Sequence, residues 1–453
     1  MNKDKNQHFE ILTRRYRKKE GRIFAFSILI LFLISLLGFA RFDGRNFAAY
    51  LTIAIQAVFI AYLLRHMAFA YTGLQMKWDR EEFSDYEPPI SILIPARNEE
   101  KVIRGLIESL AEVDYPREKF QVIAVDDASD DKTGEILDEL ARKYDWLIVI
   151  HRSKKDHDLA PGKSSVLNDA LRFASGEIIF VYDADHQVKK DTIKKIVRHF
   201  KDPKVGMAMG RCVVRNADKN ILTKLIYIEF LSGYKVNQYG RELLHGLAAY
   251  GGSNCAIRRS LLEELGGFNI SSVTEDTDLT VRGVLEGYRV VYDDDAVSTE
   301  LAVTNLTRYW KQRYRWAYGH QHVFYDYWLD VVRCKHLGIL DKIEFLMFLF
   351  IYHMPVVMFL GLLLTFMWAF GIFLPRDPFI GLTLWIVLLL GPLLELAAGL
   401  VLAREKGKMA FYLILFLPLF FLSIMICTKA FLDGIIRGIT KERYVWVKTE
   451  REI

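Results

Sequence analysis

The sequence predicts an α/β domain, with a mostly parallel sheet and helices on both faces, inserted between transmembrane α-helices. Three observations lead to this fold class. Long apolar runs lie only near the two ends of the chain. Between them, short apolar runs alternate with amphipathic segments, the order typical of a parallel sheet covered by helices. Polar clusters follow several of the short runs, where ligands bind in such sheets.

Composition narrows the possible functions. Of the 453 residues, 52% are hydrophobic and the mean hydropathy is +0.13, which is high for a soluble protein and low for a chain lying wholly in lipid. The 60 basic and 55 acidic residues leave a net charge of +5, so no nucleic-acid partner is implied. The four cysteines show no CxxC spacing, and we expect neither a disulfide framework nor a zinc site.

Five apolar runs are long enough to cross a bilayer, which takes ~20 residues per helix. They cover residues 23–40, 47–64, 345–373, 379–403 and 409–430. We therefore expect a basic N-terminus with two transmembrane helices (1–74), a domain with interfacial helices (75–340), and about three transmembrane helices with a basic tail (341–453). The first run ends like a signal peptide, but a second apolar run follows closely, which favours a span.

Basic residues predict the orientation of these spans. Residues 1–22 are rich in lysine and arginine, whereas the loop between the first two runs holds only Arg41 and Arg45. Because basic flanks stay in the cytoplasm, we expect a multi-pass protein of the cell membrane with a cytoplasmic domain. A fifth crossing would place the basic tail outside, against the same rule. Either the last run does not span or the tail is an exception.

The strands and helices of the domain begin near residue 90. The expected strands are "ISILIP", "FQVIAVDD", "LIVIH" and "GEIIFVYDADH", separated by the expected helices "EEKVIRGLIESLAEV", "DKTGEILDELARKY" and "GKSSVLNDALRFA". Polar clusters lie at the carboxyl ends of three strands, in "PARNEE", "DDASDD" and "DADH". In a parallel sheet these ends meet at one edge, so we expect the three clusters to face one cleft.

Asp183 and Asp185 form the sharpest acidic pair. They flank one residue directly after a buried strand, and they would repel each other unless a cation lay between them. Mg²⁺ or Mn²⁺ prefers such oxygen ligands, together with phosphate oxygens of a substrate. The alternative is an acidic turn, since D-x-D by itself is common.

Other polar clusters have two interpretations each. Asp127, at a strand end, can hydrogen-bond a nucleotide, while the acids just after it can simply cap the next helix. "PGKSS" lacks the first glycine of a P-loop, but Lys163 near a helix N-terminus remains a candidate phosphate ligand. Asp276 in "TED" is either a general base or a carboxylate favoured by the dipole of the helix that follows.

"WKQRYRW" (310–316) is either a membrane anchor or a ligand contact. Basic residues beside a membrane often hold only its cytoplasmic edge. On a helix, however, Gln312, Arg315 and Trp316 share one face, and Arg313 points elsewhere. An anchor does not need that order. Arginine also binds a diphosphate through two parallel hydrogen bonds of its planar guanidinium group, which lysine cannot form.

In this order, "PARNEE", "VDDASDD", "DAD", "GGSN", "TED" and "QRYRW" resemble the motifs of the processive family 2 glycosyltransferases of membranes. That family includes bacterial hyaluronan, chitin-oligosaccharide, poly-N-acetylglucosamine and cellulose synthases. The resemblance runs from about residue 88 to residue 320. It implies a GT-A domain that transfers a sugar from a nucleotide donor, usually UDP-linked, with inversion at the anomeric carbon.

The resemblance also implies roles for individual residues. Asp276 would be the catalytic base, and Asp185 and Asp183 would hold Mg²⁺ or Mn²⁺ on the donor diphosphate. Further residues expected at the nucleotide sugar are Pro95, Arg97, Glu99, Asp127 and Lys163. Residues expected at the acceptor or the diphosphate are Gly252, Ser253, Asn254, Glu275, Gln312, Arg315 and Trp316. Glycines in "YGGSN" would let backbone approach the acceptor closely.

The function implied is the elongation of a β-linked polysaccharide from a UDP-sugar and its passage across the membrane. UDP-N-acetylglucosamine is favoured as the donor, and glucose or mannose donors are left open. No gating-loop motif or cyclic-dinucleotide domain of the cellulose synthases is found, which weakens that branch. Membrane lipids are expected partners, and an accessory export subunit is left open. Two alternatives stand: a single addition to a lipid-linked acceptor, and a transporter with a nucleotide-binding domain. For the transporter, Glu395 inside an apolar run is the main feature.

Overall fold

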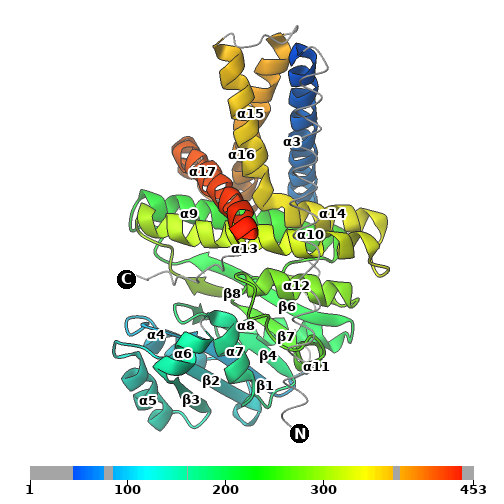
Figure 1. The fold of residues 1–453 in the computed structure, drawn as a ribbon. Coiled ribbons are helices and arrows are strands. Elements are labelled where there is room, and N and C mark those ends of the chain that lie inside the picture. Colours follow the sequence, from blue (N-terminus) through cyan, green and yellow to red (C-terminus); the bar gives the residue numbers. More distant parts are fainter. Residues whose placement is uncertain (1–43, 76–84, 161, 371–377, 441–453) are drawn as a thin grey trace.

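The computed structural model describes residues 44–75, 85–160, 162–370 and 378–440. The apolar run 23–40 and the basic tail therefore lie outside the described residues. The sheet occupies one end of the molecule, the helices α3, α15 and α16 stand at the other, and a layer of helices separates them (Figure 1).

The strands are β1 (Ile90–Ala96), β2 (Phe120–Asp127), β3 (Leu147–Arg152), β4 (Ile178–Val181), β5 (Gln187–Val188), β6 (Val205–Val214), β7 (Cys255–Arg258) and β8 (Arg289–Glu300). The helices of the sheet domain are α4 (Ile103–Ala111), α5 (Thr133–Lys143), α6 (Lys154–Leu159), α7 (Lys163–Leu171), α8 (Thr192–Val197), α11 (Arg259–Glu264) and α12 (Glu275–Leu285). The remaining helices are α3 (Gly44–Gln75), α9 (Ile221–Ser232), α10 (Tyr239–His245), α13 (Leu306–Arg333), α14 (Ile339–Phe350), α15 (Met354–Ala369), α16 (Pro378–Leu402) and α17 (Phe411–Thr440).

The eight strands form one sheet in the order β3-β2-β1-β4-β7-β6-β8-β5. The first four are parallel to one another. Strand β7 is antiparallel to both β4 and β6, whereas β6 and β8 are parallel. The parallel arrangement predicted from the alternation of strands and helices thus holds for the first half of the sheet, and the second half is mixed.

Helices cover both faces of the sheet, as predicted, because successive strand residues point to opposite sides. On β1, Ile92 and Ile94 pack in a core formed with α4, α5 and α8, while Leu93 packs in a second core with α7, α12 and α13. All three side chains are fully buried. A strand buried on both faces has no polar alternation, which explains why these runs are continuously apolar.

Three helices in the described part of the chain are long and apolar enough to cross a membrane: Tyr50–Gln75, Ile339–Met367 and Phe411–Arg437. The predicted run 345–373 is interrupted, because α14 ends at Phe350 and α15 starts at Met354. Phe345 and Leu349 of α14 pack in the same core as the sheet. Helix α14, which follows the expected domain boundary at residue 340, thus packs against the core of the sheet.

Helices α9, α10, α13 and α14 form the layer between the sheet and the upright helices (Figure 1). Helix α13 begins after Asn305, whose side chain accepts a hydrogen bond from the Arg308 amide at 2.9 Å. Helix α13 packs against α17 on one side, where its residues Ala317 and Tyr318 contact Cys427 of α17. The layer is thus packed against the sheet on one side and against the apolar helices on the other.

A buried ion cluster ties three of these helices together. Glu344 of α14 pairs with Arg65 of α3 through two hydrogen bonds of 2.5 and 2.7 Å. Its carboxylate also lies 3.1 Å from the Arg241 guanidinium of α10. All three side chains are at least nine-tenths buried. Such a cluster is stable only while each charge keeps its partner.

We predict that Glu344→Gln destabilises the protein strongly, because it removes the carboxylate with which both buried arginines, Arg65 and Arg241, pair. Breaking a buried pair from one side typically costs ~3–5 kcal/mol. The measurement is the melting temperature of purified protein in detergent. Glu139→Gln, which removes the exposed partner of Arg104, is the matched control and should change the melting temperature little. Equal melting temperatures for both variants would contradict the structural role of Glu344.

Candidate active site

A cavity of about 330 Å³ opens at the carboxyl ends of β1, β2 and β4. The predicted site residues that line it are Pro95, Arg97, Glu99, Asp127, Lys163, Asp183, Asp185, Gly252, Ser253, Glu275, Asp276, Gln312, Arg315 and Trp316. They come from strand ends and the segments after them, from the starts of α7 and α12, from the loop before β7 and from α13. Segments up to about 220 residues apart in sequence therefore meet where the strand-end clusters were expected to converge.

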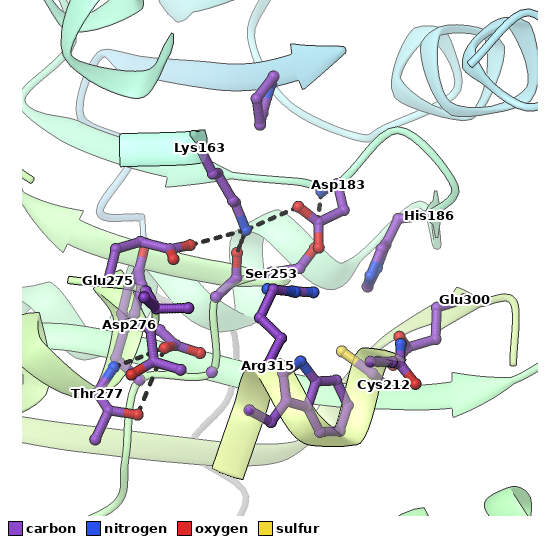
Figure 2. Close-up of a pocket in the computed structure, with 18 of the residues that line it drawn as sticks. Lys163, Asp183, His186, Cys212, Ser253, Glu275, Asp276, Thr277, Glu300 and Arg315 are labelled. Atoms are coloured by element: carbon purple, nitrogen blue, oxygen red, sulfur yellow. Dashed lines mark hydrogen bonds and ion pairs between the residues drawn. The ribbon is translucent and has the colours of Figure 1, made fainter. Parts of the chain in front are cut away.

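Lys163 lies at the centre of the charged groups (Figure 2). Its ammonium is 2.8 Å from the Asp183 carboxylate and 3.2 Å from that of Glu275, and it donates a hydrogen bond of 2.7 Å to the Gly252 carbonyl. It begins α7 directly after Gly162, whose positive φ of 107° suits glycine. Burial alone would lower the pKa of Lys163, but the neighbouring carboxylates outweigh it and raise that pKa.

Glu275 and Asp276 begin α12, at the edge of the same cavity. Burial raises the pKa of Asp276, and Lys163 and Arg315 oppose that effect by stabilising the carboxylate. The Thr277 amide donates to Asp276 Oδ1 at 2.8 Å, which fixes one carboxylate oxygen. A buried carboxylate with a raised pKa and an oriented oxygen is suited to accept a proton.

The loop before β7 brings backbone close to Asp276. Gly252 has a φ of +75°, and a Cβ added there would lie 3.0 Å from Asp276 Oδ2. The Ser253 hydroxyl accepts a hydrogen bond of 3.0 Å from the Asp183 amide. Glycine suits this positive φ at position 252, and a side chain there would crowd the Asp276 carboxylate.

Asn254 is the one predicted site residue that does not line the cavity. Its side chain is fully buried, accepts a hydrogen bond from the Tyr182 hydroxyl at 3.0 Å and donates to the Ala296 carbonyl at 3.0 Å. It has a positive φ of 52°, which asparagine tolerates better than most residues. Asn254 thus holds the loop in place, and its side chain turns away from the cavity, a direction that the sequence pattern does not show.

Helix α13 presents the face predicted from the spacing of its residues. Gln312, Arg315 and Trp316 line the cavity, and Figure 2 shows Arg315 extending from α13 toward Ser253. Arg313 points elsewhere: it pairs with Glu229 of α9 at 2.8 Å and is buried. The position of Arg315 inside the cavity favours a ligand contact over a membrane anchor.

Asp127 is held by two cationic or polar partners that the sequence analysis did not identify. Arg152 lies 2.5 Å from one carboxylate oxygen, and the His157 ring lies 2.8 Å from the other. Arg97 contacts the same ring. These contacts orient the Asp127 carboxylate at the cavity wall.

Asp183 and Asp185 supply the hard oxygen atoms that Mg²⁺ or Mn²⁺ prefers. Asp183 is one-third exposed, while Asp185 is almost fully buried and one of its oxygens accepts a hydrogen bond of 3.1 Å from the Leu301 amide. Both line the cavity. The type and the placement of these donors fit a divalent cation.

The sequence analysis missed part of the lining. His186, Cys212, Phe230, Tyr234, Gln238, Thr277, Glu300, His320, Phe348 and Tyr352 also face the cavity. His320 was accessible to sequence reasoning, because it continues the face of Gln312 and Trp316 at intervals of four. Its ring nitrogen Nδ1 lies 3.0 Å from the Thr277 hydroxyl, and burial lowers the pKa of His320 to about 3, so the ring is neutral.

Known proteins resemble this chain in sequence and in fold. Residues 91–266 match the family model described as glycosyl transferase family 2. The probable glycosyltransferase YdaM of Bacillus subtilis is 32% identical over 381 residues, which cover 83% of this chain and 89% of that protein.

Two further relatives have more specific names. A beta-monoglucosyldiacylglycerol synthase of Trichormus variabilis is 34% identical over 326 residues, covering 68% of this chain and 69% of that protein. A poly-beta-1,6-N-acetyl-D-glucosamine synthase of Staphylococcus epidermidis is 28% identical over 252 residues, covering 55% and 59%.

Among solved structures, the mannosyltransferase PcManGT of Pyrobaculum calidifontis, determined in complex with GDP-Man and Mn²⁺, has a TM-score of 0.61. It is 22% identical, and the match covers 87% of this chain and 100% of that chain. This likeness confirms the predicted GT-A fold. The family model and the relatives that share a third of their residues establish more: this chain is an enzyme of glycosyltransferase family 2.

Proposed function

We propose that the enzyme transfers a sugar from a nucleotide donor to an acceptor hydroxyl at the membrane surface, with inversion at the anomeric carbon. The observation that carries this proposal is the meeting of Asp276, Lys163 and Arg315 in one cavity with Asp183 and Asp185. A proton acceptor and a set of diphosphate-binding groups are what a single displacement requires.

In the proposed reaction, Asp276 takes the proton of the acceptor hydroxyl as its oxygen attacks the anomeric carbon. The bond from that carbon to the diphosphate oxygen breaks, and the diphosphate leaves on the opposite face, which inverts the configuration. Arg315 lies on the cavity wall where its fork can pair with the departing diphosphate. Lys163 supplies a second positive charge within the same cavity.

Asp185 and Asp183 would hold the divalent cation that the family resemblance implies. When bound, Mg²⁺ or Mn²⁺ would neutralise charge on the diphosphate. The solved mannosyltransferase with this fold carries Mn²⁺, which supports the assignment. Asp127, with Arg97 nearby, is proposed to contact the nucleoside, and a UDP-linked donor is our first choice.

A lipid acceptor is the first candidate. The relatives at 34% identity are named monoglucosyldiacylglycerol synthases. The cavity lining also includes four aromatic side chains, Phe230 and Tyr234 in or just after α9 and Phe348 and Tyr352 in or just after α14. These helices belong to the layer that packs against the apolar helices (Figure 1). A single addition to a membrane lipid needs only that the head-group hydroxyl reach Asp276.

Processive synthesis of a polysaccharide, with export across the membrane, is the second candidate. It was favoured by the sequence, and the Q-x-x-R-W residues do line the cavity. The poly-beta-1,6-N-acetyl-D-glucosamine synthase relative adds support. For either candidate we propose a cytoplasmic catalytic domain on a multi-pass protein, in line with the basic N-terminus.

Glu395, the feature that favoured a transporter, is explained by packing. Glu395 accepts hydrogen bonds from Ser232 at 3.1 Å and from Asn237 at 2.7 Å, and it lies 3.4 Å from His66. A carboxylate that joins α16 to its neighbours is explained by packing.

One experiment separates the two candidates. Purified protein in vesicles containing diacylglycerol is given labelled UDP-glucose, UDP-N-acetylglucosamine or GDP-mannose, and the products are sized. One glycolipid of defined mass supports the lipid acceptor, whereas a high-mass polymer supports processive synthesis. No incorporation from any donor would contradict the proposed transfer.

We predict that a chelator abolishes transfer and that Mg²⁺ or Mn²⁺ restores it, because the Asp183 and Asp185 carboxylates are proposed to act through a cation. The measurement is labelled product before and after the metal is returned. Undiminished transfer in excess chelator would remove the proposed role of this pair.

We predict that Asp276→Asn lowers the turnover by ~10²–10⁴-fold while donor binding is kept, since a positioned base typically contributes that much. The substitution also removes a buried charge beside Glu275, so folding should not suffer. The checks are turnover, donor affinity and melting temperature of the same preparation.

The pH dependence gives an independent test of Asp276. Because its pKa is raised, the carboxylate becomes protonated as the pH falls through a value above the usual ~3.9 of aspartate, and turnover is lost there. The acid limb should therefore lie above that value. Near-wild-type turnover of Asp276→Asn would assign the base to another residue.

We predict that Arg315→Lys reduces transfer at least about tenfold, because lysine keeps the charge but loses the bidentate fork. The control on the same helix is the exposed Lys311, and Lys311→Arg should be silent. Arg313 is unsuitable as a control, since it is buried against Glu229. Transfer by both variants is compared at matched membrane expression. Equal activity would support the interpretation of residues 310–316 as a membrane anchor.

A further inference from the structure

We propose that His186, Cys212 and Glu300 form a second cation site, separate from Asp183 and Asp185, that takes a thiophilic divalent cation such as Zn²⁺. A ring nitrogen, the thiol sulfur and a carboxylate oxygen of these residues all lie within 4.8 Å of one another. Figure 2 shows the three side chains grouped on the side of the cavity away from Glu275 and Asp276.

Neighbouring strands bring the three residues together. Cys212 of β6 lies opposite Ser298 of β8, and Glu300 follows two residues later on the same face of β8. His186 comes directly before β5, which pairs with β8 through Gln187 and Thr299. The donors therefore sit on a rigid sheet, which is the kind of support that a preformed metal site needs.

The type of donor selects the metal. Thiolate and imidazole favour Zn²⁺ and similar ions, whereas Mg²⁺ prefers oxygen atoms alone. Three protein ligands that face a cavity leave a fourth position open, as in tetrahedral zinc sites with bonds of ~2.0–2.3 Å. Such bonds require the donor atoms to approach by a small movement of side chains.

An outer contact orients the imidazole. The Ser298 hydroxyl lies 3.0 Å from His186 Nδ1 and 3.8 Å from the Cys212 sulfur. A ligating histidine normally has such a partner on its other ring nitrogen, which fixes the direction of the ring. His186 and Cys212 are buried, and Glu300 is only partly so.

The thiol proton provides a signature of binding. A bound cation displaces that proton into solvent, and the sulfur becomes a thiolate ligand. Metal uptake should therefore release a proton and create a metal–thiolate bond.

The test uses Co²⁺ as a spectroscopic substitute for Zn²⁺ in the purified full-length protein. We expect a near-ultraviolet charge-transfer band from a thiolate–Co²⁺ bond, which Zn²⁺ removes and millimolar Mg²⁺ does not. The band should disappear in Cys212→Ser and persist in Cys334→Ser, a matched substitution of a buried cysteine that lies outside the cavity.

A second variant keeps the proposal testable if Cys212→Ser does not fold. Loss of a residue that only supports a metal ligand typically costs ~10–100-fold in metal affinity. Glu300 is proposed to be a ligand itself, so Glu300→Gln should weaken Co²⁺ binding at least about tenfold. The proposal is overturned by a missing band in the wild-type protein, by a band that survives Cys212→Ser, or by unchanged affinity in Glu300→Gln. None of these results bears on sugar transfer, which is measured separately.

Discussion

The Lys163 ammonium is the interaction on which the site depends. It contacts Asp183 after β4, Glu275 at the start of α12 and the Gly252 carbonyl of the loop before β7. Without this cation, the carboxylates of Asp183, Glu275 and Asp276 would gather in a buried cavity with much of their mutual repulsion unopposed. Burial disfavours the charged form of this amine, but the neighbouring carboxylates raise the pKa of Lys163, so it stays protonated in the cavity.

The geometry of the site also depends on the apolar helices. Arg315 lies on α13, and other side chains of this helix bond to α17: the Tyr309 hydroxyl lies 3.2 Å from that of Ser423, and the Tyr314 hydroxyl donates to Asp433 at 2.5 Å. Arg313 fixes α13 to α9 in addition. The helix that carries the proposed diphosphate ligand is therefore positioned by the apolar helix α17 and by α9.

Most of the site was predictable because its residues follow strands. A run of buried apolar residues identifies a parallel strand, and the carboxyl ends of such strands converge, so Asp127, Asp183 and Asp185 meet as expected. Helical spacing likewise placed Arg315. What the sequence could not show is side-chain direction in loops and pairing across distant strands. Asn254 turned inward for this reason, and the group of His186, Cys212 and Glu300 depends on strand register between β5, β6 and β8.

The cavity lining combines two kinds of groups that come from different elements. Charged groups at the strand ends are the proposed donor contacts, whereas aromatic side chains such as Phe230 and Phe348 reach the cavity from helices of the intermediate layer. The same layer carries Arg315 on α13, and Arg313 fixes that helix to α9. The proposed donor and acceptor contacts are therefore linked, because the helices that supply aromatic side chains also position the proposed diphosphate ligand.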